Sequence, residues 1–411
     1  MSRIQNAYIF DALRTPRGKG RPASDAKPGG ALAAVPPYEL VSGLIAELAQ
    51  RNPSLIAQTR SLTLGCVGQV GPQGGHIALV SRLASVLPDD VPVLSLNNYC
   101  VSGASAVNRA AQAVAVNTGG LHLAGGVESL SQVPFLADKA SYYTDPDLLQ
   151  TLRWAPPIMG AELIATLDGF GKHDLDELTL LSHQRAAAAW REGRYAEGVA
   201  PVKDGQGNSL LSQDELIREQ LTLSQLADMP PAFADQGAQG FDAMMLEQHP
   251  NLNGIKHVHS IANCPGMADA AALVLLGSMQ AGKDAGLTAK AHIVAVEEIG
   301  GDPVLQLTAG MQALDRLLAR TKLTLMDFDR IEFMEAFAAV PLKFIRDYTP
   351  DMDKLNVNGG HLAMGHPTGA TGALLLTSLV HELQRCDGQY GLLVTQAGGG
   401  IGCAIIVERT N

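Results

Sequence analysis

The sequence has few charged and few aromatic residues, and these shortages narrow the classes of protein that it can encode. Only 17% of its 411 residues are charged and 5% are aromatic, whereas 46% are hydrophobic. The net charge of −11 argues against nucleic acid and anionic membrane surfaces as partners, because both select basic proteins. A chain of this length and apolarity predicts a well-buried globular protein of two or three domains.

Cysteine is also scarce, and its spacing argues against metal and disulfide chemistry. The five cysteines are scattered, odd in number and without a Cys-x-x-Cys pair. This usage predicts reduced thiols in a cytoplasmic protein with no disulfide framework and no metal site. The N-terminus shows no signal peptide, and no apolar run is long enough for membrane insertion. No phosphate-binding glycine motif opens a helix, so we expect no nucleotide cofactor.

Cys100 lies at the centre of the predicted organisation. Residues 91–96 are apolar and partly β-branched, which predicts a buried strand, and residues 104–116 are rich in alanine and valine, which predicts a buried helix. Cys100 would then lie at a strand-to-helix turn, where unpaired N–H groups and the helix dipole lower the pKa of a thiol. On this stretch alone, a reactive thiolate and an inert buried cysteine are equally good interpretations.

The alternation of strand-like and helical segments defines the predicted fold class, α/β. It runs through the first 126 residues and resumes after residue 270, which predicts layers around a mostly parallel sheet. Segment 127–254 interrupts it with prolines, aromatic pairs and a long helix at 175–192, which we expect Asp174 to cap. The predicted parts are an N-terminal half (1–126 with 255–285), an inserted loop domain (127–254) and a C-terminal half (286–411).

Four motifs, spread over nearly the whole chain, resemble those of one enzyme family. They are segments 98–103 (NYCVSG), 124–131 (AGGVESLS), 182–194 (which begins SHQRA and ends EGR) and 356–373 (NVNGGHLAMGHPTGATGA). Together they resemble the thiolase family. The resemblance implies a thiolase fold, in which two similar halves form a five-layered αβαβα core with an inserted loop domain. It also implies a homodimer or homotetramer that acts on acyl-CoA and CoA and needs no other cofactor.

The same resemblance assigns catalytic roles. It implies that Cys100 is the nucleophile that takes an acyl group from a CoA thioester, and that His366 is the base that activates it. It also implies that the backbone N–H groups of Cys100 and Gly398 form an oxyanion hole. Glycines such as Gly365 would let the backbone approach the substrate without a side-chain clash. A lone histidine in a glycine-rich loop is more often structural, but the Gly-His-Pro and cysteine motifs together favour catalysis.

Two positions depart from the family pattern. The terminal motif usually carries an acid/base cysteine before its glycines, and Gln396 stands there, whose amide does not titrate. Met334 stands where the family commonly has asparagine or histidine, and a thioether is a poor replacement as a hydrogen-bonding group. We expect both positions to lie at the substrate.

Three interpretations of these departures remain open. In the first, the protein is a thiolase for 3-oxoacyl-CoA cleavage or the reverse Claisen condensation, and His361, or less plausibly Cys403 or Cys264, replaces the lost cysteine. A structural role is an equal alternative for His361, and it is the favoured one for Cys403. In the second, Cys100 forms an acyl-enzyme that a different acceptor discharges. In the third, the chain is a non-catalytic acyl-CoA-binding or scaffold subunit.

Two further positions concern the substrate. Met159 lacks the neighbouring histidine of acetoacetyl-CoA-specific relatives, which predicts a longer or bulkier acyl chain. Asn263 begins a segment, Asn-Cys-Pro-Gly, that stands where relatives have Asn-Ala-Ser-Gly near the pantetheine arm. Pro265 there removes a hydroxyl and a backbone donor. We expect both Met159 and Asn263 to bind substrate.

Overall fold

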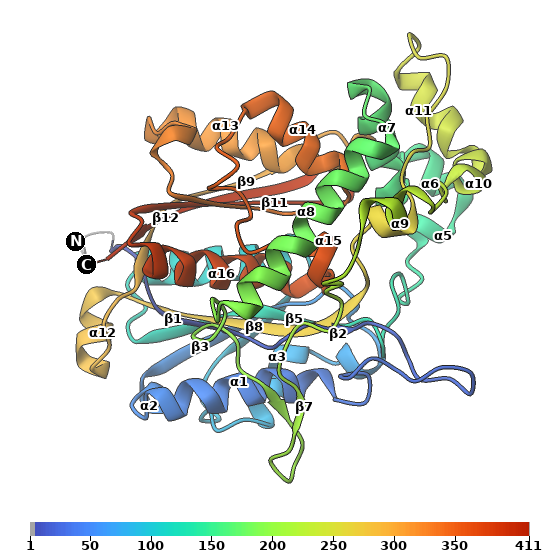
Figure 1. Cartoon of the computed structure of the whole chain (residues 1–411). Helices are drawn as coiled ribbons and strands as arrows, with labels where there is room; N and C mark the ends of the chain where they lie inside the picture. The colour runs from blue at the N-terminus through green and yellow to red at the C-terminus, as the bar shows by residue number, and fades with distance from the viewer. Residues whose placement is uncertain (1–4, 411) are drawn as a thin grey trace.

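The computed structural model describes residues 5–410, which form two facing layers of strands with helices between and outside them (Figure 1). The first layer contains β1 (Tyr8–Arg14), β2 (Gly18–Lys19), β3 (Thr59–Gly65), β4 (Val93–Leu96), β5 (Leu121–Ser129) and β8 (Ala268–Gly277). The second contains β9 (Ala291–Gly300), β10 (Arg330–Phe333), β11 (Tyr390–Ala397) and β12 (Ile401–Arg409). A separate hairpin consists of β6 (Val202–Lys203) and β7 (Ser209–Leu211).

The two layers are joined by one short strand pairing. The strand order is β10-β11-β12-β9-β1-β8-β5-β3-β4, with β2 added beside β8. The β1–β9 link consists only of Tyr8 with His292 and Ile9 with Ala291, and beyond it the two layers face each other (Figure 1).

The prediction of a mostly parallel sheet is wrong. Among the pairs of described strands in this sheet, only β3–β4, β3–β5 and β10–β11 are parallel. The glycine turn at 398–400 returns β11 directly into β12, so these two strands must be antiparallel. The chain also comes back from the long insertion into β8, which lies antiparallel between β1 and β5.

Helices complete the five layers. The outer face of the first sheet carries α1 (Pro37–Arg51), α2 (Leu55–Gln58) and α3 (Ile77–Leu83), and that of the second carries α13 (Ala309–Thr321) and α14 (Ala339–Tyr348) (Figure 1). Between the sheets run α4 (Ser102–Ala115) and α16 (Thr371–Cys386), which contact each other and strands of both halves. The short helices α12 (Met279–Ala285) and α15 (His361–Met364) connect these elements. The predicted α/β fold with an αβαβα core of two similar halves is confirmed.

The two central helices pack closely because each carries a glycine at their contact. A Cβ atom on Gly372 would lie 2.4 Å from the Ala104 nitrogen, and one on Gly103 would lie 2.8 Å from the Ala373 nitrogen. Such distances exclude any larger residue without movement of the backbone. The N-termini of α4 and α16 therefore meet between the sheets, and the residues just before each helix come together.

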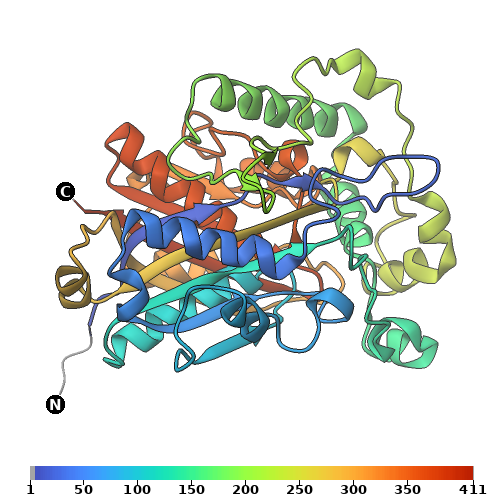
Figure 2. The ribbon, with the colours of Figure 1, turned by 90° about the horizontal axis from the view of Figure 1, so that it is seen from below.

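The teal and yellow-green parts of segment 127–254 gather beyond one end of the sheets, whereas its long green helix runs alongside the core (Figure 2). Its helices are α5 (Ser141–Thr144), α6 (Pro146–Thr151), α7 (Pro157–Asp168), α8 (Lys172–Arg191), α9 (Leu223–Ala227), α10 (Ala234–Gln236) and α11 (Asp242–Gln248). The prediction that Asp174 is the N-cap of α8 is wrong. Gly171 takes that position, and Asp174 lies in the first turn of the helix. Asp174 accepts the Gly171 N–H at 2.8 Å and still places a negative charge in the first turn.

The boundaries of the three predicted parts stay a prediction. Strand β5 continues to Ser129, past the boundary placed after residue 126, while β8 and α12 return to the first half.

In the described part of the chain, no helix combines the length and the apolar character that a membrane crossing needs.

Candidate active site

Cys100 lies on a tight turn between β4 and α4. The preceding residue, Tyr99, has a left-handed φ of 46°, which is uncommon for an aromatic residue. Hydrogen bonds hold this turn: the Asn98 N–H donates to the Ser102 hydroxyl at 2.8 Å, and that hydroxyl donates to the Tyr99 carbonyl at 2.6 Å. The Asn98 amide donates to the Ser105 hydroxyl at 2.9 Å. The turn therefore fixes the direction of the Cys100 side chain.

His366 reaches Cys100 from the glycine-rich loop before α16. Its Nε2 atom lies 3.1 Å from the Cys100 Sγ atom, and its own backbone N–H donates to the Gly266 carbonyl at 2.8 Å. The preceding Gly365 has φ of 89°, and a Cβ atom there would lie 2.5 Å from the Leu216 side chain, so this position requires glycine. The structure thus brings together the two residues that the sequence pairs.

Thr371 orients the His366 ring. Its hydroxyl lies 2.7 Å from His366 Nδ1 and donates to the Pro367 carbonyl at 3.3 Å. With its proton directed to Pro367, the hydroxyl accepts from Nδ1–H, which assigns the neutral tautomer that leaves Nε2 unprotonated. Nε2 is then free to accept the thiol proton of Cys100.

The Cys100–His366 pair rests as a neutral thiol and a neutral imidazole. Burial, and then the negative charge of Glu128, raise the pKa of Cys100 to about 12. Burial, and then the positive charge of Arg17, lower the pKa of His366 to about 3. The expectation that the helix N-terminus lowers the thiol pKa is therefore wrong for the free protein, because desolvation of the thiolate is the larger effect.

Glu128, in β5, ties the two catalytic loops together. Its buried carboxylate accepts the Val67 N–H at 2.9 Å and the Gly68 N–H at 3.0 Å from one loop. From the loop after His366 it accepts the Thr368 hydroxyl at 2.8 Å and the Gly369 N–H at 2.9 Å. A carboxylate with this many donors is well satisfied, so it positions both loops around Cys100.

A cavity opens from Cys100 toward the inserted segment. Gly398 and Gly399 of the β11–β12 turn form one side of it, and Gln306 holds that turn by accepting the Gly399 N–H at 3.1 Å. The rest of the wall is mainly apolar and aromatic, and its larger residues are Leu130, Val133, Phe135, Leu136, Tyr143 and Trp154. Cys100 and Gly398, the predicted oxyanion-hole residues, thus both border the space in which an acyl group would lie.

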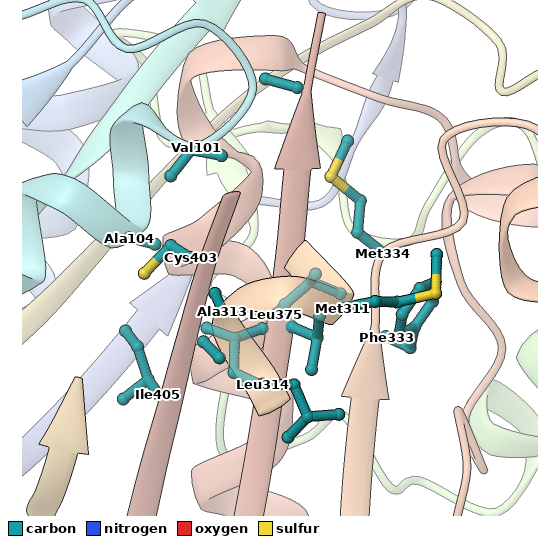
Figure 3. Close-up of a cluster of buried hydrophobic side chains, with 14 of the residues drawn as sticks. Val101, Ala104, Met311, Ala313, Leu314, Phe333, Met334, Leu375, Cys403 and Ile405 are labelled. Carbon is teal, nitrogen blue, oxygen red and sulfur yellow. The ribbon is translucent and has the colours of Figure 1, made fainter. Parts of the chain in front are cut away.

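Gln396 and Met334 lie behind this cavity rather than in its lining. The Gln396 amide donates from Nε2 to the Met334 carbonyl at 2.8 Å. Its Oε1 atom is directed toward α13, since a Cβ atom on Gly310 would lie 2.7 Å from it. Met334 is fully buried in the apolar core (Figure 3). Their role as substrate-binding residues stays a prediction that these positions do not support.

Of the three candidates for a replacement acid/base, His361 and Cys403 are fully buried and Cys264 is half-buried. His361 is fully buried with its ring edge-on to that of His366, 5.3 Å between centroids, and neither ring nitrogen has a hydrogen-bond partner among the described residues. Burial, Arg17 and His366 lower its pKa well below the ordinary range. Burial raises the pKa of the Cys403 and Cys264 thiols, and Cys403 lies in the core cluster of Figure 3.

Met159 and Asn263 lie away from the cavity lining. Met159 is fully buried in the core from α7, whereas Pro157 of the same helix borders the cavity. The Asn263 amide donates to Asp176 at 2.9 Å, and its oxygen accepts the Ser260 N–H at 2.8 Å. Asn263 therefore has a clear structural task, which is to hold its loop against α8.

The sequence interpretation assigned no role to several residues that shape the site. Thr371 lies within the motif 356–373, and Glu128 lies within the motif 124–131. Each motif therefore marked the residue as part of the site but did not show which contacts it makes. The aromatic wall of Tyr143 and Trp154 comes from the inserted segment, where no motif marks it. Within residues 5–410, no three histidine, cysteine or acidic side chains gather as ligands for a metal ion.

Comparison with known proteins identifies the family of this chain. The model of the thiolase N-terminal domain matches residues 7–239, and that of the thiolase C-terminal domain matches residues 287–409. This chain belongs to the thiolase family. It is an acyl-CoA acyltransferase of the thiolase type, and the predicted family and enzyme class are confirmed.

Thiolases from several organisms are similar over their whole length. The β-ketoadipyl-CoA thiolase of Pseudomonas knackmussii is 34% identical, with 98% of this chain and 99% of that one covered. The steroid 3-ketoacyl-CoA thiolase of Mycobacterium tuberculosis is 33% identical, covering 99% and 95%. Among solved structures, the Bacillus anthracis acetyl-CoA acetyltransferase (28% identity) and human mitochondrial 3-ketoacyl-CoA thiolase (29% identity) each superimpose with a TM-score of 0.83 over 100% of both chains.

Proposed function

We propose that this thiolase cleaves 3-oxoacyl-CoA, or runs the reverse Claisen condensation, through an acyl group on Cys100 and with His366 as the only proton carrier. The observation that carries the proposal is the 3.1 Å contact between Cys100 Sγ and His366 Nε2 at the base of an apolar cavity. CoA acts as substrate and product, and no other cofactor is proposed.

In the first half-reaction, His366 Nε2 takes the thiol proton as Cys100 attacks the C3 carbonyl of the substrate. The backbone N–H groups of Cys100 and Gly398 stabilise the negative oxygen that forms. The C2–C3 bond breaks, the acyl group stays on Cys100, and the departing acetyl-CoA carbanion takes the proton back from His366. The ring is then neutral again, so protons and charges balance.

In the second half-reaction, the same ring serves the incoming thiol. His366 Nε2 takes the proton from CoA, the CoA sulfur attacks the acyl group, and the proton moves to the departing Cys100 sulfur. This route needs no titratable group at position 396, where the amide is engaged with Met334. The full burial of His361 and Cys403, and the raised pKa of the half-buried Cys264 thiol, also favour His366 over any of them.

We further propose a cytoplasmic homodimer or homotetramer. Strand β4 ends the strand order and leaves one edge of the sheet open, and Leu94 on it is 46% exposed. An open edge with apolar side chains favours pairing with a second chain. The oligomeric state is measured by light scattering of the purified protein.

Intact-protein mass spectrometry tests the proposed reaction. Mixing with a 3-oxoacyl-CoA is expected to give an acyl adduct on Cys100, and free CoA is expected to discharge it. An adduct that persists in CoA would favour a different acceptor and contradict the second half-reaction. Absence of an adduct with both acetyl-CoA and 3-oxoacyl-CoA would contradict the proposed acyl group on Cys100. The Cys100→Ala variant is the control for the site of acylation.

A further inference from the structure

The described residues that line the cavity at Cys100 include no basic side chain, while His366 contacts Cys100 from outside this lining. Among the described residues that line it, none is lysine, arginine or histidine, and the two charged ones, Glu128 and Asp138, are both acidic. The distal wall is aromatic, with the rings of Tyr143 and Trp154 at 5.5 Å between centroids. The Trp154 ring also packs edge-on against Phe241, at 6.1 Å, which supports the wall from behind.

Most polar groups of the lining are already engaged within the protein. The Asn97 amide donates to the Val67 carbonyl at 3.2 Å and its oxygen accepts the Tyr99 N–H at 3.0 Å. Gln306 donates to the Ala155 carbonyl at 3.1 Å in addition to holding the Gly399 N–H. The Thr368 hydroxyl donates to Glu128. The Tyr99 and Tyr143 hydroxyls and the Trp154 indole N–H remain as neutral donors in this lining. An acyl group there would therefore meet no positive charge to replace the water around a carboxylate.

Asp138 places a negative charge at the mouth. Asp138 is exposed and lines the cavity. Burial, then Tyr142, and then the charge of Asp138 raise the pKa of Tyr99. Tyr99 lines the same cavity and directly precedes Cys100, so Asp138 and the reacting residue border one space. A terminal carboxylate on the acyl group would be repelled there and would find no cation among the described residues that line the cavity.

We propose that this cavity selects uncharged apolar or aromatic acyl groups and rejects acyl chains that end in a carboxylate, with Asp138 as a specificity-determining residue. The proposal rests on the proposed acyl-cysteine reaction and names its substrate class. The named substrates of the relatives include 3-oxoadipyl-CoA, which ends in a carboxylate, so this chain departs from them at the acyl end.

A matched pair of substrates tests the proposal. 3-Oxohexanoyl-CoA and 3-oxoadipyl-CoA have the same six-carbon chain and differ only in a terminal methyl or carboxylate, so they leave butyryl or succinyl on Cys100. The rate of each adduct is measured by rapid quench and intact mass, with no CoA added. We expect butyryl transfer to be at least about 10-fold faster than succinyl transfer, because the carboxylate loses its hydration without a partner. Equal rates, or faster succinyl transfer, would overturn the proposal.

Variants at the mouth assign the effect to Asp138. Asp138→Asn is expected to lower the ratio of the butyryl rate to the succinyl rate about 2- to 5-fold. Asp138→Lys is expected to lower it further, chiefly because succinyl transfer becomes faster. The matched control is Asp284→Lys in α12, which makes the same charge change at the end of the core opposite to the inserted segment (Figure 1). If both lysine variants change the ratio equally, Asp138 is not the determinant.

Acetyl-CoA separates failure of this inference from failure of the proposed function. If acetyl transfer to Cys100 occurs and the butyryl and succinyl rates are equal, the reaction stands and the selectivity fails. If no acyl group transfers from any thioester, the proposed function and this inference fail together. Calorimetric binding tests the selectivity without any chemical step. The Cys100→Ala variant is expected to bind 3-oxohexanoyl-CoA more tightly than 3-oxoadipyl-CoA. The reverse order would also overturn the proposal.

Discussion

The Nδ1 atom of His366 and the hydroxyl of Thr371 lie 2.7 Å apart, and this contact determines which nitrogen of the ring can accept a proton. The hydroxyl donates a hydrogen bond to the Pro367 carbonyl at 3.3 Å and can then accept one from Nδ1–H. In this tautomer Nε2 faces Cys100 without a proton. Thr371 is thus a positioning residue, because it acts on the reaction only through His366.

Replacing Thr371 with valine removes this hydroxyl and keeps the shape of the side chain. We expect acylation of Cys100 to slow about 10- to 100-fold, because the ring loses its preferred tautomer, while KM changes little. Single-turnover acylation followed by mass spectrometry measures the rate. Thr377→Val is the matched control, since Thr377 is also buried on α16 and its hydroxyl donates only to the Ala373 carbonyl of the same helix. Equal slowing in both variants would contradict the positioning role.

The neutral resting state of the Cys100–His366 pair predicts a particular pH dependence of alkylation. The Cys100 pKa of about 12 means that the thiolate fraction is small at neutral pH and rises with pH. The rate of alkylation by iodoacetamide should therefore rise about 10-fold for each pH unit between pH 7 and pH 10, with no plateau. A plateau that begins near pH 6 would instead indicate a resting thiolate–imidazolium pair. The Cys100→Ala variant gives the background from the other cysteines.

Restoring the family cysteine at position 396 should not improve the enzyme. In Gln396→Cys the thiol would replace an amide that contacts Met334 and α13 rather than the cavity. We expect the rate at which CoA discharges the acyl-enzyme to stay the same or fall. The free energy of unfolding should fall by about 1 to 3 kcal/mol, because the Met334 carbonyl loses its donor. Urea denaturation measures the second effect, and a clear gain in discharge rate would refute the assignment of both proton transfers to His366.

Buried His361 predicts a loss of stability in acid. Its pKa is lowered well below the ordinary value in the folded protein, so below about pH 6.5 the unfolded chain binds a proton that the folded chain does not. Stability from this group is present above the unfolded pKa and is lost as pH falls. The free energy of unfolding of His361→Leu should therefore fall less than that of the wild type between pH 7.5 and pH 5.

Urea denaturation at the two pH values checks the effect of His361→Leu. The control is His173→Leu, whose side chain is 70% exposed and which should keep the wild-type difference between the two pH values. The same His361→Leu protein also tests whether His361 acts in catalysis. We expect CoA still to discharge the acyl-enzyme, since His366 carries the proton. Loss of this discharge would restore His361 as a candidate acid/base.

The sequence by itself determined the family, the fold class and the Cys100–His366 pair. The fold class follows from local apolar patterns. The family and the pairing of Cys100 with His366 follow from the resemblance of four short motifs to those of thiolases. Strand and helix positions follow for the same reason, since apolar periodicity is local. The direction of each strand is not local, which is why the mostly parallel sheet was predicted and is wrong.

Only the tertiary structure decided the charge state and surroundings of the site. The helix N-terminus predicts a low thiol pKa at Cys100, but desolvation by residues distant in sequence and the charge of Glu128 outweigh it. The strand register directs the Gln396 side chain toward α13, away from the cavity. The aromatic wall forms because the inserted segment folds back over Cys100. Burial, register and long-range contacts depend on the whole folded chain, so no single motif could have fixed them.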